Sequence, residues 1–287
     1  MYTLTVPTLD LETVYHGPQG LRWRRLRGLN PKRFLVPHGS SCAKIEQHQD
    51  RVTVSCVDEK FYDTWFEYLD LSTDYMQVRS KGIQILGEVS NAIMASAGLH
   101  LLNMDPWESL VTSAVWYKAS PAKVRGLLNE LADRTGETRF LRVKEMGPQE
   151  WHELPDPSSL MTDLDVAYDV LGRERGKRLE RVAEAVYDGS VDPWSWHERG
   201  YDAAVRELDG LLDPSSVQRA LLWSGFKNAL PVTPRVTELA TWDYDCNDVD
   251  DFVEWHLHPV KGYEGYVSAC ITWKTMMEIE NGNSQRH

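Results

Sequence analysis

The chain has 287 residues, of which 42% are hydrophobic and 26% charged, and its formal net charge is −12. These values are typical of a globular protein with a sizeable core, and no apolar run approaches the roughly 20 residues of a membrane span, so no membrane partner is expected. The negative charge also disfavours indiscriminate binding of nucleic acid, because cationic contacts to phosphates supply most of the non-specific affinity.

A small antiparallel sheet is expected within residues 1–75. Leu21–Arg25 and Arg51–Val57 alternate with the two-residue period of a half-buried strand. Pro37 and Gly39 mark turns. The first residues have neither a basic start nor an apolar stretch, so we expect no signal peptide.

From about Ser80 the hydrophobic pattern becomes helical. Five apolar residues are spaced to share one helix face: Ile83, Leu86, Val89, Ala92 and Ile93. Asp105-Pro106 and Ser120-Pro121 are typical helix starts, because the first residue caps the helix and proline suits the first turn. The remaining expected elements are helices at Leu164–Leu171 and Gly176–Tyr187, a loop at Met146–Asp163, and a disordered tail at 281–287.

Cysteine spacing and loop motifs exclude several classes of protein. Cys42, Cys56, Cys246 and Cys270 are scattered without a Cys-x-x-Cys pair. This favours free thiols in a reducing, cytoplasmic setting over disulfides, structural zinc or an iron–sulfur cluster. His256-Leu257-His258 lacks a third ligand fixed by spacing, so no metal site is expected. No glycine-rich phosphate loop occurs, which disfavours kinases and nicotinamide enzymes, and no cofactor is expected.

Residues 212–235 resemble the helix-hairpin-helix signature of the 8-oxoguanine DNA glycosylase family. Leu212-Asp213-Pro214-Ser215-Ser216 stands where that family has a glycine-rich hairpin. Further segments similar to the family follow in the same order along the chain: Gly20–Arg25, Phe66–Tyr75, Asn103–Leu110, Tyr168–Gly172 through Ala185, Tyr201–Ala204 and Gly262–Tyr266.

The resemblance implies an α+β, mainly α, glycosylase-like fold. We expect an N-terminal antiparallel β lobe over residues 1–75. A helical domain would follow over residues 76–280, with its modified hairpin at 211–219.

The catalytic pair of the family is missing. Gln218 stands where the family has its nucleophilic lysine, and Thr233 stands where it has a catalytic aspartate. Gln218 has no amine to attack the sugar, and Thr233 has no charge to stabilise the cationic sugar. Loss of two groups that act as a unit costs many orders of magnitude in rate. Lys227, the only lysine between them, lies too far along the chain to substitute directly.

Other pocket positions differ as well. Trp116, Tyr117 and Lys118 match the region where the family has an asparagine that fills the gap left by the flipped base. Aromatic side chains there would stack on bases or fill the vacated space, or else pack in the core. Ser268 and Thr272 match the positions that read and sandwich the damaged base.

The catalytic pair, the gap-filling asparagine and the base-reading residues of the family are all replaced. This suggests a new activity on a base-flipping scaffold. The chain is similar in this respect to the phage alpha-glutamyl/putrescinyl thymine pyrophosphorylases, or amino acid:DNA transferases. That resemblance implies a transferase that joins an amino acid or amine to activated, phosphorylated 5-hydroxymethyluracil in duplex DNA, as a monomer in the host cytoplasm. Two alternatives stay open: a catalytically inactive binder of modified or damaged DNA, and a glycosylase with a non-standard nucleophile.

Candidate roles follow from the side-chain chemistry. Gln218 would hydrogen-bond the edge of a pyrimidine, or simply lie in a first helical turn. Lys118, Lys123 or Arg235 would hold a leaving phosphate, since cations bind phosphates strongly. Glu264 would deprotonate the amine, or cap the last helix.

Two basic segments are candidates for a DNA-binding face. They are residues 22–33 and residues 173–181. The alternative is that they form solvated surfaces.

Overall fold

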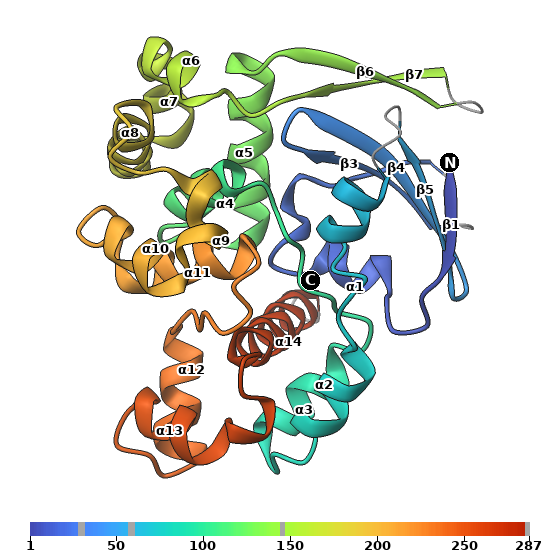
Figure 1. Ribbon diagram of the computed structural model, residues 1–287, viewed down its shortest axis with the longest axis vertical. Helices are drawn as coiled ribbons and strands as arrows, with labels where there is room; N and C mark the ends of the chain where they lie inside the picture. The colour runs from blue at the N-terminus through green and yellow to red at the C-terminus, as the bar shows by residue number, and fades with distance from the viewer. Residues whose placement is uncertain (28–31, 57–60, 144–146, 285–287) are drawn as a thin grey trace.

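The structure, a computed structural model, describes residues 1–27, 32–56, 61–143 and 147–284. An antiparallel sheet from the N-terminal part lies beside a larger helical part (Figure 1). The expected α+β, mainly helical class is therefore confirmed. Within these residues no helix combines the length and the apolar character needed to cross a bilayer.

The N-terminal sheet has the strand order β1-β5-β4-β3-β2, and each neighbouring pair is antiparallel. A tight turn joins β3 to β4, where His38 pairs with Ser41. Gly39 adopts φ +54° in that turn, a conformation that glycine reaches without steric cost. The strands are β1 Tyr2–Thr5, β2 Arg24–Arg25, β3 Lys32–His38, β4 Ser41–His48 and β5 Arg51–Cys56.

Both faces of β3 are buried. Phe34 and Val36 point into the main core, whereas Leu35 belongs to a smaller apolar cluster. That cluster includes Val143 and Trp151 of a second hairpin, formed by β6 (Thr138–Val143) and β7 (Gly147–His152). The hairpin extends over the sheet (Figure 1), so its apolar side chains cover the face that the main core leaves open.

This hairpin corrects the expected loop at Met146–Asp163. The segment contains β7 and helix α6 (Pro157–Thr162). The sequence of β7 lacks β-branched residues, so its local propensity for a strand is weak. Pairing with β6 and burial of Trp151 form the strand instead.

The helices begin largely where the caps predicted. Asp105 accepts hydrogen bonds from the Trp107 and Glu108 amides, and Ser120 accepts one from the Lys123 amide. The other helices are α1 Leu11–His16, α2 Tyr75–Gly82, α3 Glu88–Ala95, α4 Pro106–Val115, α5 Pro121–Thr135, α7 Leu164–Leu171, α8 Arg173–Tyr187, α9 Trp196–Arg199, α10 Tyr201–Leu208, α11 Pro214–Trp223, α12 Pro234–Glu238, α13 Val249–His256 and α14 Glu264–Ser284. Short 3₁₀ turns occur at Gly20–Arg22, Pro193–Ser195 and His258–Val260, and π-helical turns at Phe61–Phe66 and Leu239–Asp243.

The expected helix face beginning at Ile83 is only partly right. The chain turns between α2 and α3, so Ile83 and Leu86 are exposed. Val89, Ala92 and Ile93 of α3 are buried as expected. Periodicity alone did not show this break, because the apolar residues continue through the turn.

Helix α4 lies at the centre of the helical part. Every residue from Trp107 to Val115 is buried, as is typical of a helix surrounded by other elements. It packs against α8 and α11. The Ser109 and Ser224 hydroxyl oxygens lie 2.7 Å apart, so α4 and the end of α11 also share a buried hydrogen bond.

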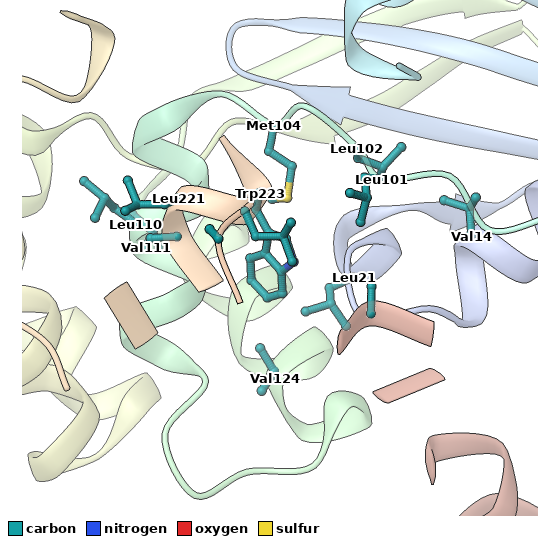
Figure 2. Close-up of a cluster of buried hydrophobic side chains, with 14 of the residues drawn as sticks. Val14, Leu21, Leu101, Leu102, Met104, Leu110, Val111, Val124, Leu221 and Trp223 are labelled. Atoms are coloured by element: carbon teal, nitrogen blue, oxygen red, sulfur yellow. The ribbon is translucent and has the colours of Figure 1, made fainter. Parts of the chain in front are cut away.

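The sheet and the helices share one hydrophobic core. Figure 2 shows Val14 and Leu21 from the N-terminal part in one cluster with Val124 of α5 and Trp223 of α11. Leu101 and Leu102, from the segment before α4, lie in the same cluster. The expected boundary between residues 75 and 76 stays a prediction.

The tail is more ordered than expected. Helix α14 continues to Ser284, whereas disorder was predicted from Asn281, and residues 285–287 lie outside the described part. Each residue added to an existing helix gains a hydrogen bond without a new nucleation cost, so polar residues extend it readily. Trp273 anchors this helix by donating to the Thr13 carbonyl.

A buried ion pair joins the segment before α2 to the loop after α11. Lys227 Nζ lies 2.7 Å from Asp70 Oδ1, and Asp70 is 1% exposed. Tyr75 and Thr73 also donate to the Asp70 carboxylate. Burial and the adjacent carboxylate raise the pKa of Tyr75 well above its ordinary value, so its hydroxyl remains a donor.

Lys227→Met is expected to destabilise the fold by about 3–5 kcal/mol, because it leaves the Asp70 carboxylate buried without its cation. Urea denaturation would measure the loss. The double variant Asp70→Asn, Lys227→Met should recover part of it, since the unpaired charge is then removed. Equal stability of wild type and Lys227→Met would contradict this role.

Candidate active site

The connection between α10 and α11 is fixed by side chains. Asp213 caps α11 by accepting from the Ser216 amide and hydroxyl. Arg178 of α8 donates to Asp213 Oδ2 at 2.7 Å, to the Ser216 hydroxyl and to the Ala114 carbonyl. Although burial raises the pKa of Asp213, hydrogen bonds from Ser216 and Arg178 lower it overall. The carboxylate is therefore ionised, and it occupies the amide end of α11.

A small cavity lies beside α11. It has a volume of about 130 Å³. Its walls come from the N-terminal part, the end of α4, α11, the loop before α12, and α14. The lining residues are Pro18, Trp116, Arg219, Leu222, Trp223, Pro231, Thr233, Ser268, Ala269 and Thr272.

This cavity brings together four predicted site residues that are far apart in the sequence. Trp116, Thr233, Ser268 and Thr272 all line it. Thr233 also caps α12, accepting from the Val236 amide. Ser268 is buried and donates to the Pro231 carbonyl at 2.8 Å, which fixes α14 against the loop before α12. The cavity contains neither lysine nor a carboxylate among its described lining residues.

Sequence reasoning missed the one cation of the described lining, Arg219. It follows Gln218 on α11, and its guanidinium carbon lies 5.2 Å from the Trp116 ring and 5.9 Å from the Trp223 ring. It donates to the Trp116 carbonyl at 3.4 Å. Burial lowers the pKa of Arg219 to about 10, so the group remains a cation at neutral pH. The family pattern drew attention to position 218, and only helix geometry turns position 219 into the cavity.

Gln218 does not line the cavity. Its side-chain oxygen accepts from the Tyr201 hydroxyl at 2.6 Å and from the Leu230 amide at 3.2 Å. It therefore holds the loop before α12 to α11. The expected contact between Gln218 and a pyrimidine edge stays a prediction.

Five other predicted residues also lie outside the cavity lining, Tyr117 among them. Arg235 faces acidic side chains, with ion pairs to Glu88, Glu238 and Asp243 at 3.6–3.9 Å. Glu264 begins α14 and accepts from the Gly262 amide, which precedes the helix, so its predicted roles as a base or a helix cap stay predictions. The remaining two, Lys118 and Lys123, are exposed on the surface.

Tyr117 and Lys118 point to a neighbouring surface. The Lys118 ammonium and the Arg178 guanidinium lie 5.1 Å and 4.6 Å from the Tyr117 ring. Arg175 donates to the Lys118 carbonyl at 3.0 Å, which ties α8 to this loop. A shallow cavity of about 460 Å³ beside Tyr117 has basic and acidic lining residues: Glu174, Lys177, Arg178, Glu180 and Arg181.

The basic segment at residues 22–33 is largely neutralised within the fold. Arg22 is buried and pairs with Glu108 of α4 at 3.1 Å. The other ion pairs of the segment join Arg25 to Glu12, Lys32 to Asp10 and Arg33 to Glu46. This corrects the expectation that the segment presents a free basic face, because the acids that neutralise it are distant in sequence.

Lys227 is likewise committed to structure. Its ion pair with Asp70 and its contact with Thr73 leave it outside the described lining of the cavity. It is therefore not placed to act as a replacement nucleophile. No group of three or more His, Cys, Asp or Glu side chains suited to a metal ion occurs in the described part of the chain.

Comparisons with known proteins agree with this architecture. Residues 1–110 match the family described as the N-terminal domain of 8-oxoguanine DNA glycosylase. No curated protein sequence matches the chain.

Among solved structures, MBOgg1 in complex with a low-affinity DNA ligand superposes with a TM-score of 0.82 at 17% identity, covering 96% of this chain and 94% of that one. The Clostridium acetobutylicum 8-oxoguanine glycosylase/lyase in complex with double-stranded DNA gives 0.81 at 16% identity, covering 96% and 94%. The 3-methyladenine DNA glycosylase from Archaeoglobus fulgidus gives 0.70 at 11% identity, covering 97% and 99%. The chain therefore has the helix-hairpin-helix DNA glycosylase fold.

Proposed function

We propose that this protein is a DNA-modifying transferase that flips an activated 5-hydroxymethyluracil out of the duplex into the cavity beside α11. The observation that carries the proposal is the chemistry of the cavity wall. The wall includes Trp116, Thr233, Ser268 and Thr272, and its described lining residues include neither a lysine nor a carboxylate. Such a pocket can hold a base, but it lacks the groups for lysine-dependent cleavage of the glycosidic bond.

The size of the cavity supports a pyrimidine substrate. Its volume of about 130 Å³ is close to the roughly 150 Å³ in which a benzene ring binds to an engineered cavity of another protein. One six-membered ring fits this space better than the two fused rings of a purine. Trp116 and Trp223 supply aromatic faces against which a flipped base can pack.

The proposed reaction is a displacement at the exocyclic methylene of the base. The amine nitrogen of an amino acid or polyamine forms a bond to the methylene carbon. The bond from that carbon to the phosphate oxygen breaks, and its electron pair leaves with phosphate or pyrophosphate. The nitrogen loses a proton to solvent. The described cavity lining places no carboxylate to accept that proton, and Glu264 is engaged at the start of α14.

Duplex DNA would contact the surface next to the cavity. Trp116 of the cavity wall is followed by Tyr117 and Lys118, and Lys118 is bonded to α8 through Arg175. Arg173, Lys177 and Arg181 of α8 are exposed, with no ion pair within the described part of the chain. These cations outside the cavity can bind phosphates, whereas Arg178 is engaged by Asp213.

The transfer is tested by mass spectrometry. Duplex DNA containing phosphorylated 5-hydroxymethyluracil is incubated with the protein and a mixture of amino acids and polyamines, then digested to nucleosides. A nucleoside bearing the amine is expected, and unphosphorylated 5-hydroxymethyluracil should give none. Trp116→Ala should reduce the yield about tenfold or more by removing a stacking partner. The exposed Trp242 provides the matched control, Trp242→Ala. Binding without product would favour a non-catalytic reader of modified DNA.

The protein is expected not to nick DNA that contains 8-oxoguanine or uracil, because neither Gln218 nor Thr233 supplies the required chemistry. Borohydride should trap no covalent complex. The double variant Gln218→Lys, Thr233→Asp should recover at most a trace of cleavage. The reason is that Gln218→Lys removes the oxygen that accepts from the Leu230 amide. Robust nicking by the wild type would show instead a glycosylase with a different nucleophile.

Affinity for duplex DNA should fall with salt. If about four to six phosphates are neutralised, a plot of the logarithm of the binding constant against the logarithm of the salt concentration has a slope of roughly −4 to −5. Lys177→Gln and Arg181→Gln should each make the slope shallower by about 1, uniformly across sequences. Arg51→Gln on β5 is the control, being exposed on the sheet. A slope that is the same in all three variants would place the DNA on another surface.

A further inference from the structure

Arg219 has no anionic partner among the residues that the structure describes. It is partly buried beside two indole rings, and within the described part of the chain its hydrogen bond, at 3.4 Å, goes to a backbone carbonyl. No carboxylate lies within ion-pair distance of it in the part of the chain that the structure describes. The charge of Asp213 raises the pKa of Arg219, but this carboxylate is already bonded to Arg178.

Partial burial of the Arg219 guanidinium is unfavourable unless an anion compensates its positive charge. Removing a cation from water costs free energy, and cation–π contacts recover only part of it. Burial accordingly lowers the pKa of Arg219 to about 10. The other large buried cation of the region, Arg178, has its counter-ion in Asp213. The difference between these two arginines indicates that the anion for Arg219 comes from a ligand.

We propose that Arg219 is a specificity-determining residue, and that its guanidinium binds a phosphate or pyrophosphate carried on the 5-methylene of the flipped base. This assignment rests on the proposed function and gives it a recognition group. Arg219 lines the small cavity and is partly exposed, so a substituent on a pyrimidine ring bound there can reach its guanidinium. Arginine donors suit this role, because their planar fork matches two phosphate oxygens.

The DNA backbone is a second source of phosphate. Backbone phosphates remain at the solvated surface, where Lys118, Lys177 and Arg181 are available. Arg219 instead shares the cavity with the buried Ser268 and Trp223. The substituent of the base is therefore the favoured partner.

Binding assays separate the two sources. Duplexes that differ only in one base carry thymine, 5-hydroxymethyluracil or its phosphorylated form. The wild type should prefer the phosphorylated base about tenfold or more, as expected for a charged hydrogen bond. Arg219→Met should abolish that preference and leave thymine DNA binding unchanged, and Arg219→Lys should retain part of it. Arg51→Gln is the control. An equal loss of affinity for all three duplexes in Arg219→Met would show that Arg219 binds a phosphate of the DNA backbone, and would overturn the proposal.

A stability measurement distinguishes ligand binding from a structural role. Because Arg219 has no counter-ion among the described residues, Arg219→Met should leave the melting temperature of the free protein unchanged or raise it. Inorganic pyrophosphate should raise the melting temperature of the wild type and not that of Arg219→Met. A fall of several degrees in free Arg219→Met would show that the arginine serves the fold, and would overturn the proposal.

The binding assays test the anion site at Arg219 separately from the transfer reaction. A preference for the phosphorylated base that depends on Arg219, without an aminated nucleoside, would support the anion site and reject the transferase. An aminated nucleoside together with an undiminished preference in Arg219→Met would retain the transferase and reject the anion site.

Discussion

The arrangement of the candidate site depends on the buried guanidinium of Arg178. It joins three helices, because it extends from α8 to the Ala114 carbonyl of α4 and to the first turn of α11. Its bond to Asp213 holds the residue that caps α11. The start and rotation of α11 determine which of its side chains enter the cavity. This contact therefore places Arg219 in the cavity wall and Gln218 against Tyr201.

Arg178 and Arg219 differ in how their charge is compensated within the protein. Arg178 has a carboxylate, a hydroxyl and a carbonyl as partners, so its burial is compensated. The partners of Arg219 in the described part of the chain are two aromatic rings and, at 3.4 Å, the Trp116 carbonyl. A group that is poorly compensated in the free protein is available to a ligand, and functional sites commonly retain such groups at a cost in stability.

The connection at residues 211–219, where the 8-oxoguanine DNA glycosylase family has a glycine-rich hairpin, differs in its charge. The amide end of a helix attracts anions, including phosphates. In this chain the Asp213 carboxylate already occupies the start of α11, and its own charge is balanced by Arg178. We therefore expect DNA phosphates to be held mainly by the cations of α8 and by Lys118. This expectation is compatible with the net charge of −12, because a protein that is negative overall attracts phosphates through local clusters of cations.

Much of the architecture was accessible from the sequence. Strand alternation, the capping residues Asp105 and Ser120, and the resemblance around residues 212–235 predicted the mainly helical α+β class correctly. The absence of an amine at Gln218 and of a carboxylate at Thr233 is also a property of the sequence alone. These features depend on local chemistry or on residue identity, which the chain carries without reference to its fold.

Only the tertiary structure decided which side chains meet. β7 forms through pairing with β6 and burial of Trp151, although its own residues have little strand propensity. The basic segment at residues 22–33 is neutralised by acids from other elements, Glu108 among them. Arg235 was expected near the substrate but faces carboxylates, whereas Arg219 faces the cavity. Ion pairing and burial depend on contacts between distant residues, and a single sequence does not specify those contacts until the helices are packed.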